Sequence, residues 1–181
     1  MASIINVQNE ETLKNPYSEK RIESIKNFVQ EILFHQNLEN WEVNILFSSD
    51  EFIRDLNKNY RNIDSPTDVL SFEQGDFYMG EDEKEYFCAG DIVISDETLT
   101  FNAEKFNIHK DDELKRLIIH GILHLSGFDH GEYHVDVNGN ILDGNSTVVV
   151  LNDETKTNEE IQMLVLQETI FSKFNDRILE V

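Results

Sequence analysis

Three histidines near the middle of the chain have the spacing of metal ligands. His120 and His124 lie four residues apart, so on a helix both imidazoles project from one face, with about 5–6 Å between their Cβ atoms. Gly127 is suited to end that helix, because glycine adopts the left-handed conformation without a Cβ penalty. The chain that turns back there can bring His130 to the open side of an ion. Three neutral imidazoles with a vacant fourth position are typical of a catalytic zinc.

Two other interpretations of these histidines are weaker. A structural zinc site closed by thiolates is excluded, because Cys88 is the one cysteine of the chain. It stands in the apolar run 86–89, and we expect it to be a small core residue. The histidines could also be ordinary polar residues of an amphipathic helix. Their placement at ligand spacing around a single glycine favours metal binding.

The same spacing, His-x-x-x-His-x-x-Gly-x-x-His, is found in the metzincin peptidases, with one change. Gly121 occupies the position at which those enzymes carry the glutamate that acts as general base. A peptidase without that carboxylate would be badly impaired. Another zinc hydrolase, including a peptidase, is therefore a weaker alternative.

Composition limits the class of protein. The 181 residues suit one well-buried domain, and the 39% hydrophobic content supports an ordinary globular core. No run approaches the roughly 18 apolar residues that a membrane span needs, and residues 1–7 lack the pattern of a secretory signal. We therefore expect a cytoplasmic protein that has no membrane partner.

The formal net charge of −21 argues against a nonspecific nucleic-acid binder, because such binding depends on Lys and Arg that neutralise phosphates. Any contact with RNA must then be local, and DNA is not an expected partner. The acidic balance by itself needs no explanation beyond solubility.

Hydrophobic periodicity and capping signals predict the elements that would position the histidines. We expect residues 74–85, which are rich in Glu and Asp, to form an exposed hairpin or loop. After His130 an insert at about 131–155 suggests two short strands near an Asn-Gly turn. The predicted strands are 3–8, 41–47, 68–72, 87–94, 135–142 and 147–151, and the predicted helices are 18–36, 50–59, 96–106, a metal-binding helix opened by 111–113, and a last helix from about 157 through 171.

The predicted helix over 50–59 divides into an apolar and a basic face. Arg54, Lys58 and the following Arg61 are spaced four and three residues apart. In a chain with 15 basic residues, this cluster is a candidate phosphate-binding patch. For Arg54 and Lys58 alone, a solvated helix face is the simpler interpretation.

Three segments together resemble the YbeY family of bacterial metal-dependent endoribonucleases, which act in ribosomal RNA maturation. The segment 120–130 reads HGILHLSGFDH and is similar to the family's H-G-x-L-H-L-x-G-Y-D-H, with Phe128 in place of Tyr. The segment 60–72 is similar to Y-R-x-x-D-x-P-T-D-V-L-S-F, and 90–95 is similar to G-D-I-x-I-S. The insert at 131–155 departs from the family pattern.

The resemblance implies one zinc ion per chain, held by His120, His124 and His130, and a functional arginine at Arg61. It implies an α+β, zincin-like fold in which helices flank a mixed four-stranded sheet and the metal lies in a cleft. It also implies single-strand-specific cleavage of RNA at the 3′ end of small-subunit ribosomal RNA, with a role in ribosome quality control.

The chemistry agrees with a phosphate-binding role for Arg61, because a guanidinium presents a planar fork of donors that matches a phosphate. The nucleophile stays open between a zinc-bound hydroxide and the 2′-hydroxyl of the RNA itself. A different class of function is also open, namely a ribosome-assembly protein in which zinc only holds the fold.

Overall fold

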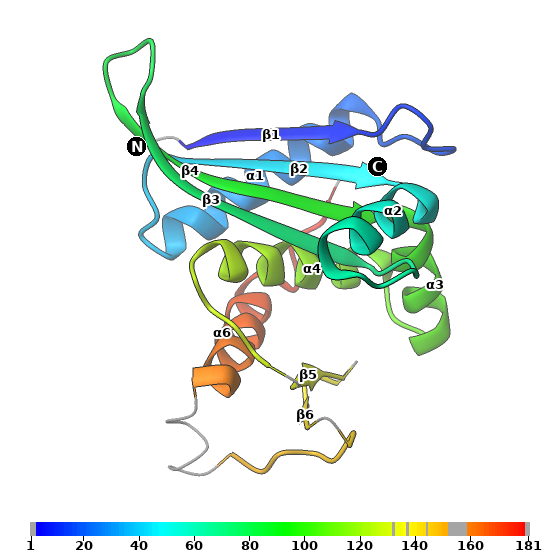
Figure 1. Ribbon diagram of the computed structural model, residues 1–181. Coiled ribbons are helices and arrows are strands. Elements are labelled where there is room, and N and C mark those ends of the chain that lie inside the picture. The colour runs from blue at the N-terminus through cyan, green and yellow to red at the C-terminus, as the bar shows by residue number, and fades with distance from the viewer. Residues whose placement is uncertain (1–2, 132, 137, 144, 152–158, 180–181) are drawn as a thin grey trace.

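A mixed four-stranded sheet forms the centre of the protein, with strand order β1-β2-β4-β3 (Figure 1). The computed structural model describes residues 3–131, 133–136, 138–143, 145–151 and 159–179. β2 is parallel to β1 and to β4, whereas β3 is antiparallel to β4 and forms an edge of the sheet. The four strands are β1 (Ile4–Asn9), β2 (Trp41–Ser48), β3 (Val69–Met79) and β4 (Glu85–Ser95).

The main core lies between one face of this sheet and two helices, α1 (Glu19–His35) and α4 (Lys110–Leu125). Alternate residues of β2 are buried, as expected for a strand that covers a core on one face. Ile32 of α1, Ile45 of β2 and Ile122 of α4 belong to the same buried cluster. The metal-binding helix predicted from the histidine spacing is therefore a core element of the fold.

Helix α2 (Asp50–Arg61) covers the opposite face of the sheet. Its Ile53 packs with Leu70 of β3 and Val93 of β4 in a separate buried cluster. Ser49 caps the helix by accepting a hydrogen bond from the Phe52 amide at 3.3 Å. Helix α3 (Asp96–Phe106) follows β4 directly, with Ser95 as its cap. The predicted starts of both helices are confirmed.

The last helix, α6 (Glu159–Phe174), packs against α4 (Figure 1). Lys115 of α4 is almost completely buried, and its Nζ donates to the carbonyl oxygens of Phe174 at 3.4 Å and Asn175 at 2.8 Å. A cation at the C-terminal end of a helix satisfies carbonyls that have no partner within that helix. The two helices are thus joined by a polar contact as well as by apolar packing.

Residues 74–85 form a hairpin, one of the two forms predicted for this segment. β3 continues to Met79 and forms the first strand of the hairpin, and β4, which begins at Glu85, forms the second. The turn is closed by a hydrogen bond from the Gly80 amide to the Lys84 carbonyl at 2.8 Å. The side chains of residues 74–79 are exposed.

The insert is only partly as predicted. β5 (His134–Val135) and β6 (Ile141–Leu142) pair antiparallel, and Gly139 in the turn between them has a φ of +80°. The strand predicted over 147–151 is wrong, because this segment makes a single bridge, between Val148 and Leu142. β6 is only two residues long and therefore offers little backbone for a third strand to pair with. Residues 132, 137, 144 and 152–155 of the predicted insert lie outside the described residues.

The prediction that Cys88 is a core residue is also wrong. Its side chain is half-exposed, and Sγ contacts Oε1 of Gln74 at 2.7 Å. Ala89, the next residue, is the one that points into the core. The apolar run 86–89 lies within β4, and alternate side chains of a strand face opposite sides of the sheet. Within the described part of the chain, no helix has the length and apolar character needed to cross a membrane.

Candidate metal centre

The C-terminal end of α4 is built so that the chain reverses immediately after His124. Gly127 has a φ of +83°, and its amide donates to the His124 carbonyl at 2.8 Å. The Phe128 amide donates to the Leu123 carbonyl at 3.1 Å. These hydrogen bonds satisfy the last carbonyls of the helix, as in other helices that end at a left-handed glycine. The predicted stop at Gly127 is confirmed.

The three predicted ligands come together at this reversal. Candidate ligand atoms of His120, His124 and His130 all lie within 4.8 Å of one another. His120 and His124 project from the same face of α4, and His130 reaches them from the loop that follows Gly127. All three side chains are half-buried.

The hydrogen bonds around the first two rings leave two nitrogens facing each other. His120 Nδ1 lies 2.9 Å from Oε1 of Gln167, and His124 Nδ1 lies 3.0 Å from the carbonyl oxygen of Phe128. Because both partners are acceptors, each Nδ1 carries the proton and each Nε2 presents a lone pair. The two Nε2 atoms are 3.0 Å apart. Two lone pairs at that distance repel unless a cation binds both, so this donor set fits a metal ion.

His130 supports the same conclusion. Its Nδ1 is buried and, among the described residues, has no hydrogen-bond partner. The loop that presents it is held by Asp129, whose Oδ1 accepts hydrogen bonds from the His130 amide at 2.7 Å and the Gly131 amide at 3.4 Å. These two amides lower the pKa of the Asp129 carboxyl below its usual value. Asp129 therefore stays ionised and keeps the loop in place.

Burial keeps the ring nitrogens available for a metal. Desolvation lowers the pKa of His120 to about 4, and the neighbouring charge of His124 acts in the same direction. Desolvation likewise lowers the pKa of His124. Both rings are consequently neutral at pH 7, which is the form that binds metal ions.

Arg61 lies beside the three histidines. It lines a cavity of about 320 Å³ together with the three histidines, and Ser71 and Val69 of β3 form part of the same wall. Its positive charge contributes to the lowered pKa of His120. The Arg61 side chain makes no ion pair or hydrogen bond with the described residues. Its guanidinium is therefore free to bind an anion.

The other two basic residues of α2 are placed differently. Arg54 Nε lies 2.6 Å from Oδ1 of Asp64, and Lys58 Nζ lies 2.9 Å from Oδ2 of the same carboxylate. Both pairs are exposed to solvent, so they contribute little to stability. Asp64 nevertheless neutralises much of the charge that a phosphate would meet there. The structure separates Arg61 from the patch that sequence spacing suggested.

The packing around Gly121 explains why no glutamate stands at this position of α4. A Cβ at this position would lie 2.7 Å from Cδ1 and 2.9 Å from Cγ1 of Ile92 on β4. Even a methyl group would force the Ile92 side chain to shift, and a glutamate side chain would need a larger shift. The position that carries the general base in metzincin peptidases therefore serves here in the packing of the helix against the sheet.

Gln167 is a site residue that sequence reasoning missed. It belongs to α6, is 4% exposed, and holds His120 from a position 47 residues further along the chain. Its Nε2 donates to Glu168 Oε1 at 3.1 Å, which leaves Oε1 to accept from the imidazole. The available signal was a polar residue three positions after Leu164 and three before Ile170, on the buried face of the last helix.

Comparison with known proteins identifies the family of this chain. A sequence profile of the family described as Endoribonuclease YbeY matches residues 3–138. The chain belongs to the YbeY endoribonuclease family. A Treponema denticola protein named Endoribonuclease YbeY is 59% identical over 108 residues, which cover 60% of this chain and 70% of that protein. A protein of the same name from Borreliella burgdorferi strain ZS7 is 34% identical over 156 residues, which cover 84% of this chain and 85% of that protein.

The YbeY profile includes the three histidines and Arg61 and ends inside the predicted insert. The fold agrees with a solved structure as well. A solution structure of a Thermotoga maritima protein matches over 98% of this chain and 96% of that one, with a TM-score of 0.54 and 25% sequence identity. The predicted α+β fold, with a mixed four-stranded sheet flanked by helices, is confirmed.

Proposed function

We propose that this YbeY-family chain is a zinc-dependent endoribonuclease that cuts single-stranded RNA, with ribosomal RNA at the 3′ end of the small subunit as its substrate. The relatives named Endoribonuclease YbeY support the reaction class. The observation that carries the proposal is the meeting of three metal-binding imidazoles with an unpaired arginine in one cavity. In this proposal the enzyme acts in the cytoplasm and contributes to ribosome quality control.

Each side chain has a definite part in this mechanism. His120, His124 and His130 would hold one zinc ion, which when bound supplies Lewis-acid polarisation of a phosphate oxygen. The Arg61 guanidinium binds the same phosphate through two parallel N–H donors and stabilises the negative charge that develops during cleavage. Gln167 fixes the tautomer of His120, so that the metal-facing nitrogen keeps its lone pair.

The acidic composition makes a local phosphate site necessary. A net charge of −21 repels RNA at long range, so affinity must arise within a few ångströms of the phosphate. With Arg54 and Lys58 bound to Asp64, few phosphate contacts remain outside the metal site. We therefore expect RNA binding to weaken only gradually as salt is added.

The decisive experiment compares Arg61→Lys with Arg54→Ala in single-turnover cleavage at saturating RNA. Lysine keeps the charge but loses the planar fork, so we expect cleavage to slow by about 100-fold or more while zinc content stays unchanged. Arg54→Ala removes a basic residue of the same helix that is already paired, and we expect it to leave the cleavage rate within about twofold.

Two results would contradict the proposal. If Arg61→Lys cuts as fast as the parent, Arg61 does not act on the phosphate. If the metal-loaded parent cuts neither structured nor unstructured RNA, the chain is better described as an assembly factor in which the metal is structural.

A further inference from the structure

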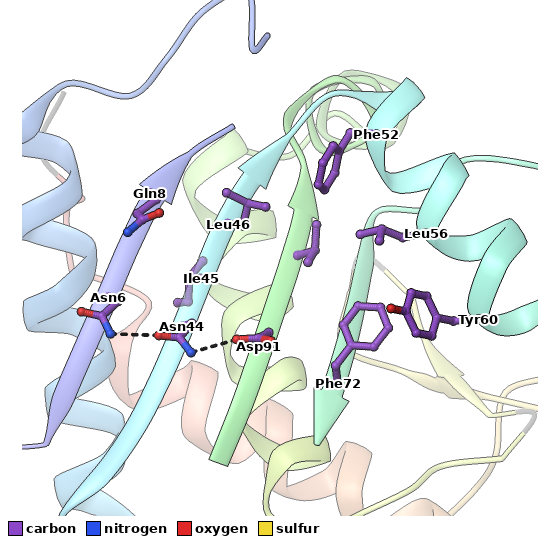
Figure 2. Close-up of a pocket in the computed structure, with 11 residues that line it drawn as sticks. Asn6, Gln8, Asn44, Ile45, Leu46, Phe52, Leu56, Tyr60, Phe72 and Asp91 are labelled. Carbon is purple, nitrogen blue, oxygen red and sulfur yellow. Dashed lines mark hydrogen bonds between the residues drawn. The ribbon is translucent and has the colours of Figure 1, made fainter. Parts of the chain in front are cut away.

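A second cavity, of about 480 Å³, lies between α2 and the sheet (Figure 2). We call it the α2-side cavity. It opens on the face of the sheet opposite the histidines, as two consecutive residues of β3 show. Ser71 lines the histidine cavity, whereas Phe72 lines the α2-side cavity. Successive side chains of a strand point to opposite faces, so β3 separates the two cavities.

The floor of the α2-side cavity is a row of polar side chains on three neighbouring strands. Asn6, Asn44 and Asp91 are register partners on β1, β2 and β4. Asn6 Nδ2 donates to Asn44 Oδ1 at 2.9 Å, and Asn44 Nδ2 donates to Asp91 Oδ1 at 2.8 Å (Figure 2). Both of these hydrogen bonds run in the direction of Asp91, and Asn6 Nδ2 also donates to Glu42 Oε1 at 3.4 Å. Its Oδ2 has no hydrogen-bond partner among the described residues, so the row ends in a carboxylate oxygen that can accept.

Aromatic side chains form the wall beside this row. Phe52 and Tyr60 come from α2, and Phe72 comes from β3 (Figure 2). Tyr60 packs against Phe72 with ring centroids 5.1 Å apart, although the tyrosine is 69% exposed. Aromatic faces beside a polar edge are the elements that proteins use to hold unpaired bases, because a base has both a flat face and hydrogen-bonding edges.

We propose that the α2-side cavity binds one unpaired base of the RNA, with guanine preferred. Guanine presents N1–H and an N2 amino hydrogen side by side, which matches a carboxylate in two parallel hydrogen bonds. Adenine and cytosine offer an amino group beside a ring acceptor. Uracil offers N3–H between two carbonyl oxygens, which the Asp91 carboxylate repels. This assignment rests on the proposed function for its substrate class.

The position of the cavity relative to Arg61 fits one continuous RNA strand. Tyr60 and Arg61 are consecutive at the end of α2, and Phe72 follows Ser71 on β3. β3 is an edge strand, so a nucleic acid can pass over it from one face of the sheet to the other (Figure 1). When one phosphate is bound at Arg61, the base of a nearby nucleotide can reach the aromatic wall. The carboxylate rejects phosphate, which keeps the RNA backbone outside the cavity and admits only the base.

The test measures binding of end-labelled hexauridine, and of the same hexamer with one central guanosine, by fluorescence anisotropy. RNA length is checked after each titration, so the readout does not depend on cleavage. We expect the metal-loaded parent to bind the guanosine hexamer about tenfold more tightly, the effect of one good two-hydrogen-bond contact. Asp91→Asn should reduce that ratio to within about twofold, whereas Asp55→Asn, the same charge change at an exposed position of α2, should keep it.

A second variant keeps the proposal testable if Asp91→Asn disturbs the sheet. Tyr60→Ala changes a residue that is 69% exposed, and we expect it to weaken binding of both hexamers about tenfold through lost stacking. Phe101→Ala removes an aromatic ring that is 61% exposed on α3 and should leave binding unchanged.

Equal affinity of the parent for both hexamers would overturn the proposal, and so would an unchanged ratio in a folded Asp91→Asn variant. A cavity that receives a protein segment instead of a base would give one of these two results. The outcome is separate from that of the proposed function: a parent that cuts RNA without base preference refutes only the base site. A parent with the Asp91-dependent preference but without cleavage refutes only the nuclease activity.

Discussion

Helix α4 and the segment 131–151 both border the three histidines, but the two regions are packed against the rest of the protein in very different ways. Ile118, Ile119 and Ile122 of α4 are completely buried between the sheet and neighbouring helices. In the segment after the third ligand, Ile141 is the anchor, 5% exposed in a small cluster with Ile161 and Leu164 of α6. The difference shows that ligand positions are fixed by the main core, while the insert is attached beside them and has its own small core.

Removing a histidine of α4 should have the largest effect of all, a loss of metal affinity. His120→Ala takes one of three imidazoles from the cluster, and we expect metal affinity to fall by more than about 100-fold, beyond the loss typical of an outer-shell change. Elemental analysis after dialysis measures it. His35→Ala, an exposed histidine at the end of α1, is the control and should retain one metal per chain. Undiminished zinc in His120→Ala would show that the cluster is not the site.

Gln167→Ala should come next, because it leaves all three ligands in place. Without the Gln167 oxygen, the His120 ring loses the partner that fixes its tautomer and orientation. We expect metal affinity to fall by about 10–100-fold, measured by competition with a chelator. Gln162→Ala on the same helix is a matched change outside the site. An equal loss in both variants would indicate damage to α6 and not to the metal centre.

The packing of α4 can be tested at Gly121. Alanine favours a helix by about 1 kcal/mol over glycine, but its Cβ would lie 2.7 Å from Ile92, and such overpacking costs about 1–3 kcal/mol. We expect a net loss of about 1 kcal/mol in the free energy of unfolding by denaturant. Ile92→Val removes the Cδ1 atom and should recover part of the loss in the double variant. A Gly121→Ala protein more stable than the parent would show that the sheet yields at this point.

The smallest effect is expected in the insert. Ile141→Ala should loosen only the cluster on α6, so that protease cuts within 131–151 faster while global stability changes little. Val150, which is 79% exposed, provides the control, and Val150→Ala should change neither quantity. If Ile141→Ala also releases the metal, the insert supports the ligands and is not separate from the main core.

Local spacing was enough to predict the metal helix, its end at Gly127 and the convergence of the three histidines. These features depend on helix geometry and on one glycine, both of which can be read from neighbouring residues. Resemblance to a family supplied Arg61, which spacing alone grouped with Arg54 and Lys58. The pairing of those two with Asp64 depends on how the chain folds back after α2, and no periodicity encodes it.

The remaining features depend on contacts between distant segments. Gln167 reaches His120 only because α6 packs on α4. The α2-side cavity requires three strands that are separated in sequence to come into register. The prediction for Cys88 was wrong because successive residues of an apolar run in a strand point to opposite faces of the sheet. The strand predicted over 147–151 had the right residue types but no adequate partner strand.

The buried Lys115 limits how early in synthesis α4 can reach its final packing. Its ammonium group pairs with Asp112 of the same helix at 2.9 Å and also donates to the carbonyls of Phe174 and Asn175, which are synthesised about sixty residues after it. Until that part of the chain has emerged from the ribosome, the buried ammonium group of α4 lacks both of these carbonyls and has to rely on Asp112. Gln167 arrives in the same late segment. The hydrogen bond that holds His120 can therefore form only after residue 167 has left the ribosome.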